Sequence, residues 1–271
     1  RLVYFSVCKC LRKQFTQLFP PKHPYFKAPA EAKQVIEQVT QEAIREKRIR
    51  DMVEELPDNL TPDEKQAIAV HNLEIEEALK ITKGKPMTVE QADQQHANPN
   101  YGKKYEYSIN CQTCAPAYVL RLMGFNVTAK ANTKNSLSEY LSRQRSFEAW
   151  TNTDGSPAVP TLTYDWMIAK GYKQMSKKRY AEYFEECCKE TGVYILTIGW
   201  KGGGGHATVL QRFEDGTLKY IEPQVYSERS GAKRSIDELC ESGATKPYPK
   251  RGVLRVDNKL FDTKFASIFD K

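Results

Sequence analysis

The sequence predicts an α+β protein, with helices first and antiparallel strands last. Helical periodicity of apolar residues dominates residues 29–82, and β-branched, alternating segments gather after residue 192. Helices that precede strands, instead of alternating with them, are typical of this class. The composition changes after "TKGKP" (82–86). We therefore expect a helical accessory or connector region at residues 1–83 and a second domain at residues 84–271.

Two long helices are expected in the first region. One runs from Pro29 to about Leu56 and is ended by Pro57. The other begins with Thr61 as N-cap and Pro62 in its first turn. His71 falls on the apolar stripe of the second helix, so we expect a core or partner contact there and not a catalytic role.

Charge and cysteine content narrow the functional class. The 41 basic and 34 acidic residues are interspersed, so the net charge of +7 indicates a mixed surface, and no nucleic-acid partner is expected. No apolar run approaches the ~20 residues of a membrane span. The 7 cysteines have irregular spacing, which predicts a reducing compartment and neither disulfides, metal nor other cofactor.

Shorter elements follow in the second region. Helices are expected near 136–150, 161–170 and 177–190, and strands at "VYILTIGW", "HATVLQRF", "LKYIEPQ" and "GVLRVD". Cys187 and Cys188 fall at helical spacing with Tyr180, Tyr183 and Phe184, which predicts a buried stripe.

A pair of cysteines stands at the start of another helix, in "YSINCQTCAPAYVLRLMGF" (107–125). Because proline has no N–H to donate, Pro116 predicts that the regular helix begins no earlier than about Thr113. Cys111 then lies on the approach and Cys114 in the first turn. The positive end of the helix dipole lowers the pKa of a thiol, so either cysteine is a candidate nucleophile.

A redox pair is the lesser alternative for these cysteines. C-x-x-C before a helix, with "VPTL" (159–162) downstream, is similar to a thioredoxin-like site. That fold requires an apolar strand before the first cysteine, and "NYGKKYEYSIN" is too polar for a central strand.

A glycine run precedes a histidine in "IGWKGGGGHATVLQ" (198–211). It matches the G-x-G-x-x-A pattern of a dinucleotide-binding loop, but the residues after it alternate as a strand and do not open a helix. We therefore expect a strand, a glycine loop and a second strand that begins with His206.

The next turn predicts a partner for His206. If "EDG" forms a three-residue loop with Gly216 in the left-handed bulge position, Phe213 pairs with Thr217. His206 then faces Gln224, and Glu222 lies diagonally beside it on the same face. An imidazole with an acid or amide on one nitrogen and a thiol on the other is an acyl-transfer site. Glu222 is the preferred orienting residue, with Gln224 as the alternative.

The same residues resemble a known family. "INCQTCAPAYVLRLMGFNVTA" followed by "GGGGHATVLQRFEDGTLKYIEPQ" resembles the papain-fold toxin domains of bacterial polymorphic toxin systems, over about residues 84–245. The resemblance implies a papain-like fold with Cys111 as nucleophile, His206 as base and Glu222 as third residue, where the family more often has aspartate. Such domains also occur fused to phage and mobile-element proteins, which fits the helical region before residue 84.

The function expected from these residues is a thiol-dependent hydrolase. Its substrate would be a protein, either deamidated at glutamine or cleaved, and an immunity protein or phage structural protein is a further expected partner. A rival from another class is a phage or mobile-element structural or interaction protein that keeps the fold without catalysis. Backbone N–H groups at the helix start, Asn110 or Gln112 are the expected donors to an oxyanion.

Overall fold

The computed structural model describes residues 30–93, 97–143, 145–225 and 233–271. The protein is α+β, with antiparallel sheets, as the sequence predicts. Its helices are α2 (Ala30–Glu54), α3 (Pro62–Leu79), α4 (Val89–Asp93), α5 (Tyr105–Ser108), α6 (Cys111–Leu122), α7 (Leu137–Ser142), η1 (Ser146–Ala149), α8 (Thr163–Ala169), α9 (Lys177–Cys187), α10 (Ile236–Ser242) and η2 (Thr263–Ile268). Its strands are β1 (Thr128–Ala129), β2 (Trp150–Thr151), β3 (Thr161–Leu162), β4 (Gly192–Gly199), β5 (Gly205–Arg212), β6 (Leu218–Ile221), β7 (Lys233–Arg234), β8 (Gly252–Arg255), β9 (Leu260–Phe261) and β10 (Phe269–Asp270).

The chain divides into two compact units, residues 1–48 and 49–271, and the division falls inside α2. The predicted domain boundary between residues 83 and 84 therefore lies within the second unit. The reason is that α3 packs against η2 and β9 and buries its apolar face there. Thr61 caps α3 through a reciprocal pair of hydrogen bonds with Glu64, as its sequence predicts.

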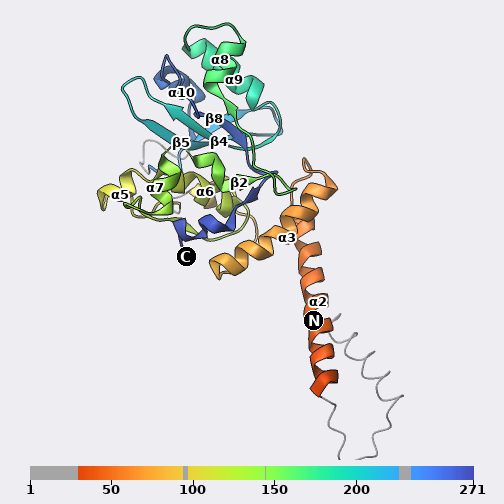
Figure 1. The fold of residues 1–271 in the computed structure, drawn as a ribbon. Helices are drawn as coiled ribbons and strands as arrows, with labels where there is room; N and C mark the ends of the chain where they lie inside the picture. Colours follow the sequence, from red (N-terminus) through yellow and green to blue (C-terminus); the bar gives the residue numbers. More distant parts are fainter. Residues whose placement is uncertain (1–29, 94–96, 144, 226–232) are drawn as a thin grey trace, which may run out of the picture. The chain divides into compact units, whose positions relative to one another are not determined.

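A six-stranded sheet with the order β3-β8-β4-β5-β6-β7 organises the second unit. Helix α6 covers one face of this sheet, and α8, α9 and α10 cover the other (Figure 1). The alternation of side chains explains the two layers. Ile195 and Val209 pack in the cluster that contains α6, whereas Leu196 and Leu210 pack in the cluster that contains α9.

Helix α6 begins at Cys111, two residues earlier than the proline argument predicts. The carbonyl of Asn110 accepts from the amides of both Thr113 and Cys114, at 2.8 and 3.0 Å, so helical bonding starts one residue before Cys111. Pro116 lies inside the helix. The expected helix at 136–150 is likewise two pieces, α7 and η1.

The glycine run lies in the loop between β4 and β5, and the residues after it form a strand. This is the strand, loop and strand that the alternating pattern predicts, and no helix begins there to bind a pyrophosphate. Gly203 and Gly204 have φ angles of +93° and +78°, which residues with a side chain rarely adopt.

The predicted bulge at Gly216 is confirmed. Gly216 has a φ of +79°, and the amide of Phe213 donates to the carbonyl of Thr217 at 2.9 Å. Strands β5 and β6 then pair from Arg212–Leu218 to Val209–Ile221, in the predicted register. The pairing stops there, however, so the expected pair between His206 and Gln224 does not form.

Candidate functional site

Three segments that are far apart in sequence meet at one end of the large sheet. Helix α6 contributes Cys111 as its first residue, β5 contributes His206 as its second residue, and Glu222 directly follows β6. All three side chains are buried, with 9%, 8% and 4% of their surfaces exposed, so ion pairing among them is only weakly screened by water.

His206 connects the other two residues. Its Nε2 lies 2.6 Å from Oε2 of Glu222. The imidazole is also hydrogen-bonded to the Cys111 thiol. The structure thus brings together the three residues that the sequence singled out.

Further hydrogen bonds fix the Glu222 carboxylate. The Tyr220 hydroxyl donates to Oε2 at 2.7 Å, and the backbone amide of Gln224 donates to Oε1 at 3.0 Å. The side chain of Gln224 instead donates to Oδ1 of Asn110 at 3.3 Å. Glu222, and not Gln224, therefore orients the imidazole.

The end of the β5–β6 pairing also serves the thiol. Among the described residues, the pairing of β5 with β6 ends at Val209, and the amide of Ala207 donates to the Cys111 sulfur. A donor at this position stabilises a thiolate more than a thiol.

The electrostatics favour a thiolate–imidazolium pair. Burial raises the pKa of Cys111, but hydrogen bonding and charge from His206, together with the Ala207 amide, bring it below its ordinary value. Burial lowers the pKa of His206, but the Glu222 charge and the hydrogen bond with Cys111 raise it to about 10. Burial likewise opposes ionisation of Glu222, but the His206 charge together with the hydrogen bonds from His206, Tyr220 and Gln224 lowers the pKa of that carboxyl.

Cys114 lies behind the site and is fully buried. Its sulfur donates to Oδ1 of Asn110 at 3.2 Å. Burial, and then the charges of Cys111 and Glu222, raise the pKa of this thiol well above its ordinary value. Of the two candidate nucleophiles, only Cys111 has a base beside it.

Asn110 is occupied by structural hydrogen bonds and is not available to an oxyanion. Its Nδ2 donates to Oδ1 of Asn98 at 3.2 Å and to the carbonyl of Lys130 at 3.0 Å. The side-chain oxygen of Gln112, the second residue of α6, accepts from the Ser146 hydroxyl. The side-chain nitrogen of Gln112 therefore remains as a donor.

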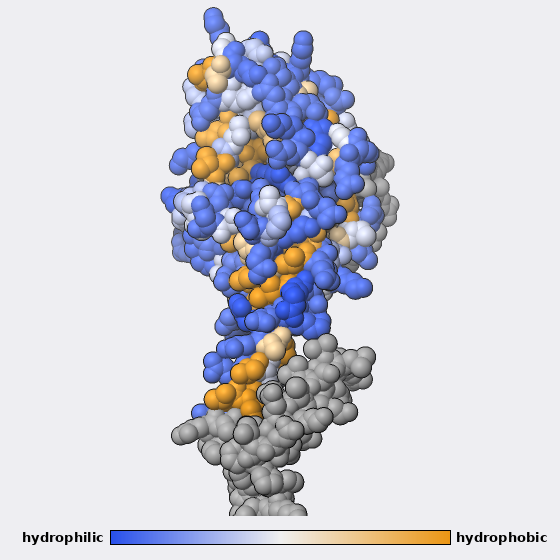
Figure 2. Space-filling view, turned by 90° about the vertical axis from the view of Figure 1, so that its right-hand side faces the viewer, coloured by the Kyte–Doolittle hydropathy of each residue, from blue (hydrophilic) through white to orange (hydrophobic). Residues whose placement is uncertain are grey.

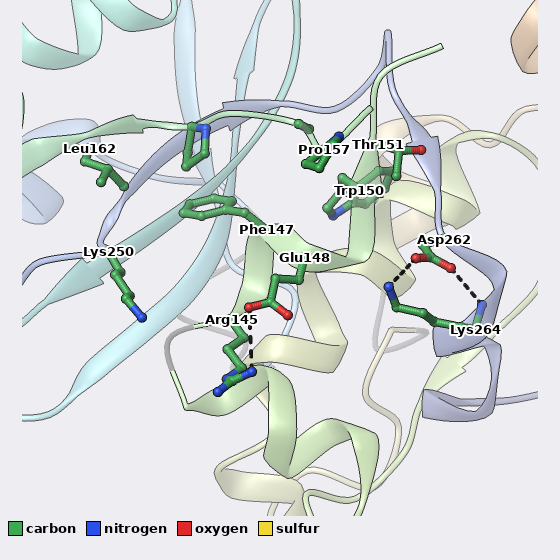
Figure 3. A pocket seen from close by; sticks show the side chains of 12 residues that line it. Arg145, Phe147, Glu148, Trp150, Thr151, Pro157, Leu162, Lys250, Asp262 and Lys264 are labelled. Atoms are coloured by element: carbon green, nitrogen blue, oxygen red, sulfur yellow. Dashed lines mark hydrogen bonds and ion pairs between the residues drawn. The ribbon is translucent and has the colours of Figure 1, made fainter. Parts of the chain in front are cut away.

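One pocket is lined by two of the site residues, and a second lies against a neighbouring segment. One, of about 450 Å³, is lined by His206, Glu222 and Trp200, whose ring stacks on the imidazole with centroids 5.8 Å apart. The other, of about 400 Å³, has an apolar wall that includes Phe147, with Trp150 and Leu162 on either side (Figure 3). It adjoins the thiol helix through Ser146, the neighbour of Phe147.

The segment before Cys111 does not fit a redox pair. Helix α5 precedes the cysteines, where a thioredoxin-like site needs a strand. His71, as expected for a structural residue, bonds Glu74 and the carbonyl of Phe261, both at 2.6 Å. Among the described residues, no group of three or more His, Cys, Asp or Glu side chains is arranged to hold a metal ion.

Sequence reasoning missed three contributors to the site: Tyr220, Asn98 and Ser146. Only Tyr220 left a signal, because it stands two residues before Glu222 and so shares its face of the strand.

None of the helices in the described ranges is long and apolar enough to cross a membrane. Comparisons with protein families, with curated proteins and with solved structures find no match for this chain.

Proposed function

We propose that the protein is a papain-like cysteine hydrolase that acts on an amide of a protein substrate. The observation that carries the proposal is the buried row of Cys111, His206 and Glu222, with His206 bonded to both of the other residues. An imidazole held in this way exchanges one proton with a thiol while its other nitrogen keeps a fixed orientation.

The resemblance to papain-fold toxin domains agrees with this assignment. The order of nucleophile, base and acid along the chain is that of the family, and the thiol begins a helix packed on an antiparallel sheet. Glutamine deamidation and peptide-bond cleavage remain the two forms of the reaction, since both begin with attack of a thiolate on an amide carbonyl.

The first step joins the substrate to the enzyme. The Cys111 thiolate attacks the carbonyl carbon, and the carbonyl oxygen becomes an oxyanion. The amides of Cys111 and Gln112 precede the first intrahelical bond of α6, so they are available to donate to that oxygen at the positive end of the helix.

Two proton transfers complete the reaction. The His206 imidazolium gives its proton to the departing nitrogen, the C–N bond breaks, and ammonia or an amine leaves a thioester on Cys111. Neutral His206 then removes a proton from water, which attacks the thioester carbonyl. The C–S bond breaks, and a carboxylic acid is released as the thiolate–imidazolium pair forms again.

Site-specific alkylation tests the proposal. Iodoacetamide at neutral pH should label Cys111 much faster than the other cysteines, and His206→Ala should abolish that difference. Incubation of a cell extract with the wild type and with Cys111→Ser should then give wild-type-dependent glutamine-to-glutamate mass shifts of about 1 Da or new chain ends. Slow, equal labelling of every cysteine would reject the hydrolase.

One observation favours a second candidate, a structural or interaction protein. Helix α2 exposes Val35, Ile36, Val39 and Ile44, with 59%, 41%, 46% and 46% of their surfaces accessible (orange, lower part of Figure 2). An apolar stripe of this kind is typical of a protein contact. If Cys111→Ser and His206→Ala bind a protein partner as the wild type does and produce the same effect in cells, this candidate is favoured over the hydrolase.

A further inference from the structure

Arg251 lies directly before β8, and its guanidinium covers Gly205 at the start of β5. A Cβ atom on Gly205 would lie 2.5 Å from Nη2 and 2.8 Å from Cζ of Arg251. Glycine at position 205 therefore makes room for the guanidinium, which gives one glycine of the run a specific purpose.

This place is on the thiol side of the sheet. Gly205 and Ala207 are two residues apart on β5, so they share one face and are separated by about 7 Å along the strand. Ala207 is the residue whose amide donates to the Cys111 sulfur. Burial lowers the pKa of Arg251, and the negative charges of Cys111 and Tyr248 partly offset that effect.

The guanidinium has no acceptor among the described residues. Its Nε and Nη1 are buried without a hydrogen-bond partner. Arg212 and Arg255 differ, because each is ion-paired with a glutamate at 2.7 Å. A buried polar nitrogen without a partner is costly, so these two nitrogens favour an acceptor from outside the described residues.

The adjacent cation in the chain, Lys250, has no ion-pair partner in the part of the chain that the structure describes. Lys250 adopts a left-handed backbone conformation with a φ of +66°, and its side chain lines the pocket of Figure 3. The other cations of that pocket are paired, Arg145 with Glu148 and Lys264 with Asp262. Lys250 in this pocket is therefore the sequence neighbour of Arg251, whose charge interacts with Cys111.

We propose that Arg251, with Lys250 beside it, binds the carboxylate of an acidic side chain in the substrate, close to the amide that Cys111 attacks. The inference rests on the proposed function and adds a substrate class, an acidic protein segment. A guanidinium fits the planar carboxylate better than an ammonium does, and the reach of Arg251 to the thiol face places that carboxylate near the reacting carbonyl.

Four iodoacetyl probes test this selectivity without knowledge of the natural target. They are iodoacetamide, N-iodoacetyl-aspartic acid α-amide, its asparagine isostere and N-iodoacetyl-glycine. In each case the Cys111 sulfur bonds to the methylene carbon and iodide leaves. Rate constants at Cys111 are divided by those for N-acetylcysteine amide, which removes differences in intrinsic reactivity.

The wild type should react about tenfold faster with the aspartate probe than with the asparagine probe. Arg251→Gln should bring this ratio close to one, because both rate constants are measured on the same variant and any change in thiol reactivity cancels, and Arg251→Lys should retain part of it. Lys250→Ala should lower the ratio, whereas Lys173→Ala, which removes an exposed charge outside the site, should not. A matching preference for the glycine probe would assign the site to a chain-end carboxylate and overturn the choice of a side chain.

The two proposals fail in different ways. If iodoacetamide does not label Cys111 selectively, the hydrolase is rejected. If labelling is selective but the wild-type ratio is near one, or if it survives in Arg251→Gln, the carboxylate site is rejected. An unchanged melting temperature shows that Arg251→Gln is folded; Arg251→Lys and Lys250→Ala give the same test if it is not.

Discussion

The Tyr220 hydroxyl donates to the same oxygen of Glu222 that faces His206, with an O···O distance of 2.7 Å. One carboxylate oxygen therefore serves both a phenol and an imidazole, and Oε1 is fixed by the amide of Gln224. The direction of the carboxylate is set from three sides before any substrate arrives.

Tyr220→Phe should weaken this arrangement without breaking it. Loss of a donor makes the Glu222 anion less stable and so supports the imidazolium less. The acid limb of Cys111 alkylation should move to higher pH, and the free energy of unfolding should fall by about 1 kcal/mol. Tyr194→Phe is the matched control, because its hydroxyl bonds the Glu190 carbonyl away from the site; it should destabilise similarly without moving the limb. Equal pH profiles in both variants would show that Tyr220 has no positioning role.

The two neighbouring cysteines should behave differently toward iodoacetamide. Mass spectrometry of the labelled wild type should find the label on Cys111, since Cys114 is fully buried with a raised pKa. Cys114→Ala should retain fast labelling, and Cys111→Ser should lose it. Fast labelling that survives in Cys111→Ser and disappears in Cys114→Ala would reverse the assignment.

Alkylation and hydrolysis should depend differently on pH. Alkylation needs only the thiolate, so its rate should rise at a pH below the ordinary thiol pKa and stay level up to about pH 10. Hydrolysis also needs protonated His206, so it should fall as pH rises through about 10. Glu222→Gln removes the charge that raises the His206 pKa, and the alkaline limb should therefore move to lower pH. An unmoved limb would mean that another group controls it.

The same pKa shifts predict how stability depends on pH. The folded pKa of His206 is raised, so its contribution is fully present below the unfolded value and is lost as pH rises toward about 10. The folded pKa of Glu222 is lowered, so its contribution is present above the ordinary carboxyl value and is lost on acidification. In Glu222→Gln, the free energy of unfolding measured with urea should change less with pH than in the wild type, at both the acid and the alkaline end of this range.

The bulge at Gly216 should be sensitive to a side chain. Its φ is +79°, and a Cβ there would meet nothing within 4 Å, so Gly216→Ala costs only backbone strain, about 1 kcal/mol. Gly202→Ala is the matched control, because that glycine also faces open space but has no left-handed φ. Urea unfolding should separate the two variants; equal stabilities would argue against the bulge.

Local signals explain what the sequence could predict. Asp215 and Gly216 define the turn, and the turn defines the register that places Glu222 at His206. The sequence also contains the reason why β6 ends early. Pro223 has no backbone N–H to donate to a neighbouring strand, so the strand pairing could not continue to Gln224. The expected pair between His206 and Gln224 was wrong because the register set by the turn does not extend past this proline.

Other features depend on tertiary contacts that no local pattern contains. Arg251 reaches Gly205 only because the chain returns to the sheet through β8. Pro116 lacks an N–H donor and so predicts a later start for α6. The Asn110 carbonyl nevertheless accepts from the amides of Thr113 and Cys114, and the helix therefore starts earlier. Tight hydrogen bonding before the helix outweighed the effect of Pro116.

The hydrogen bond from the Ala207 amide to the Cys111 sulfur decides which substitution of Cys111 gives the better inactive variant. Where a further strand would offer a carbonyl, the sulfur of Cys111 is the acceptor, so the reactive atom also completes the hydrogen bonding of the sheet edge. Alanine at position 111 would leave a buried donor unpaired and loosen the place where His206 stands. Serine keeps an acceptor there, and it is the better substitution for trapping an unreacted substrate in its native pose.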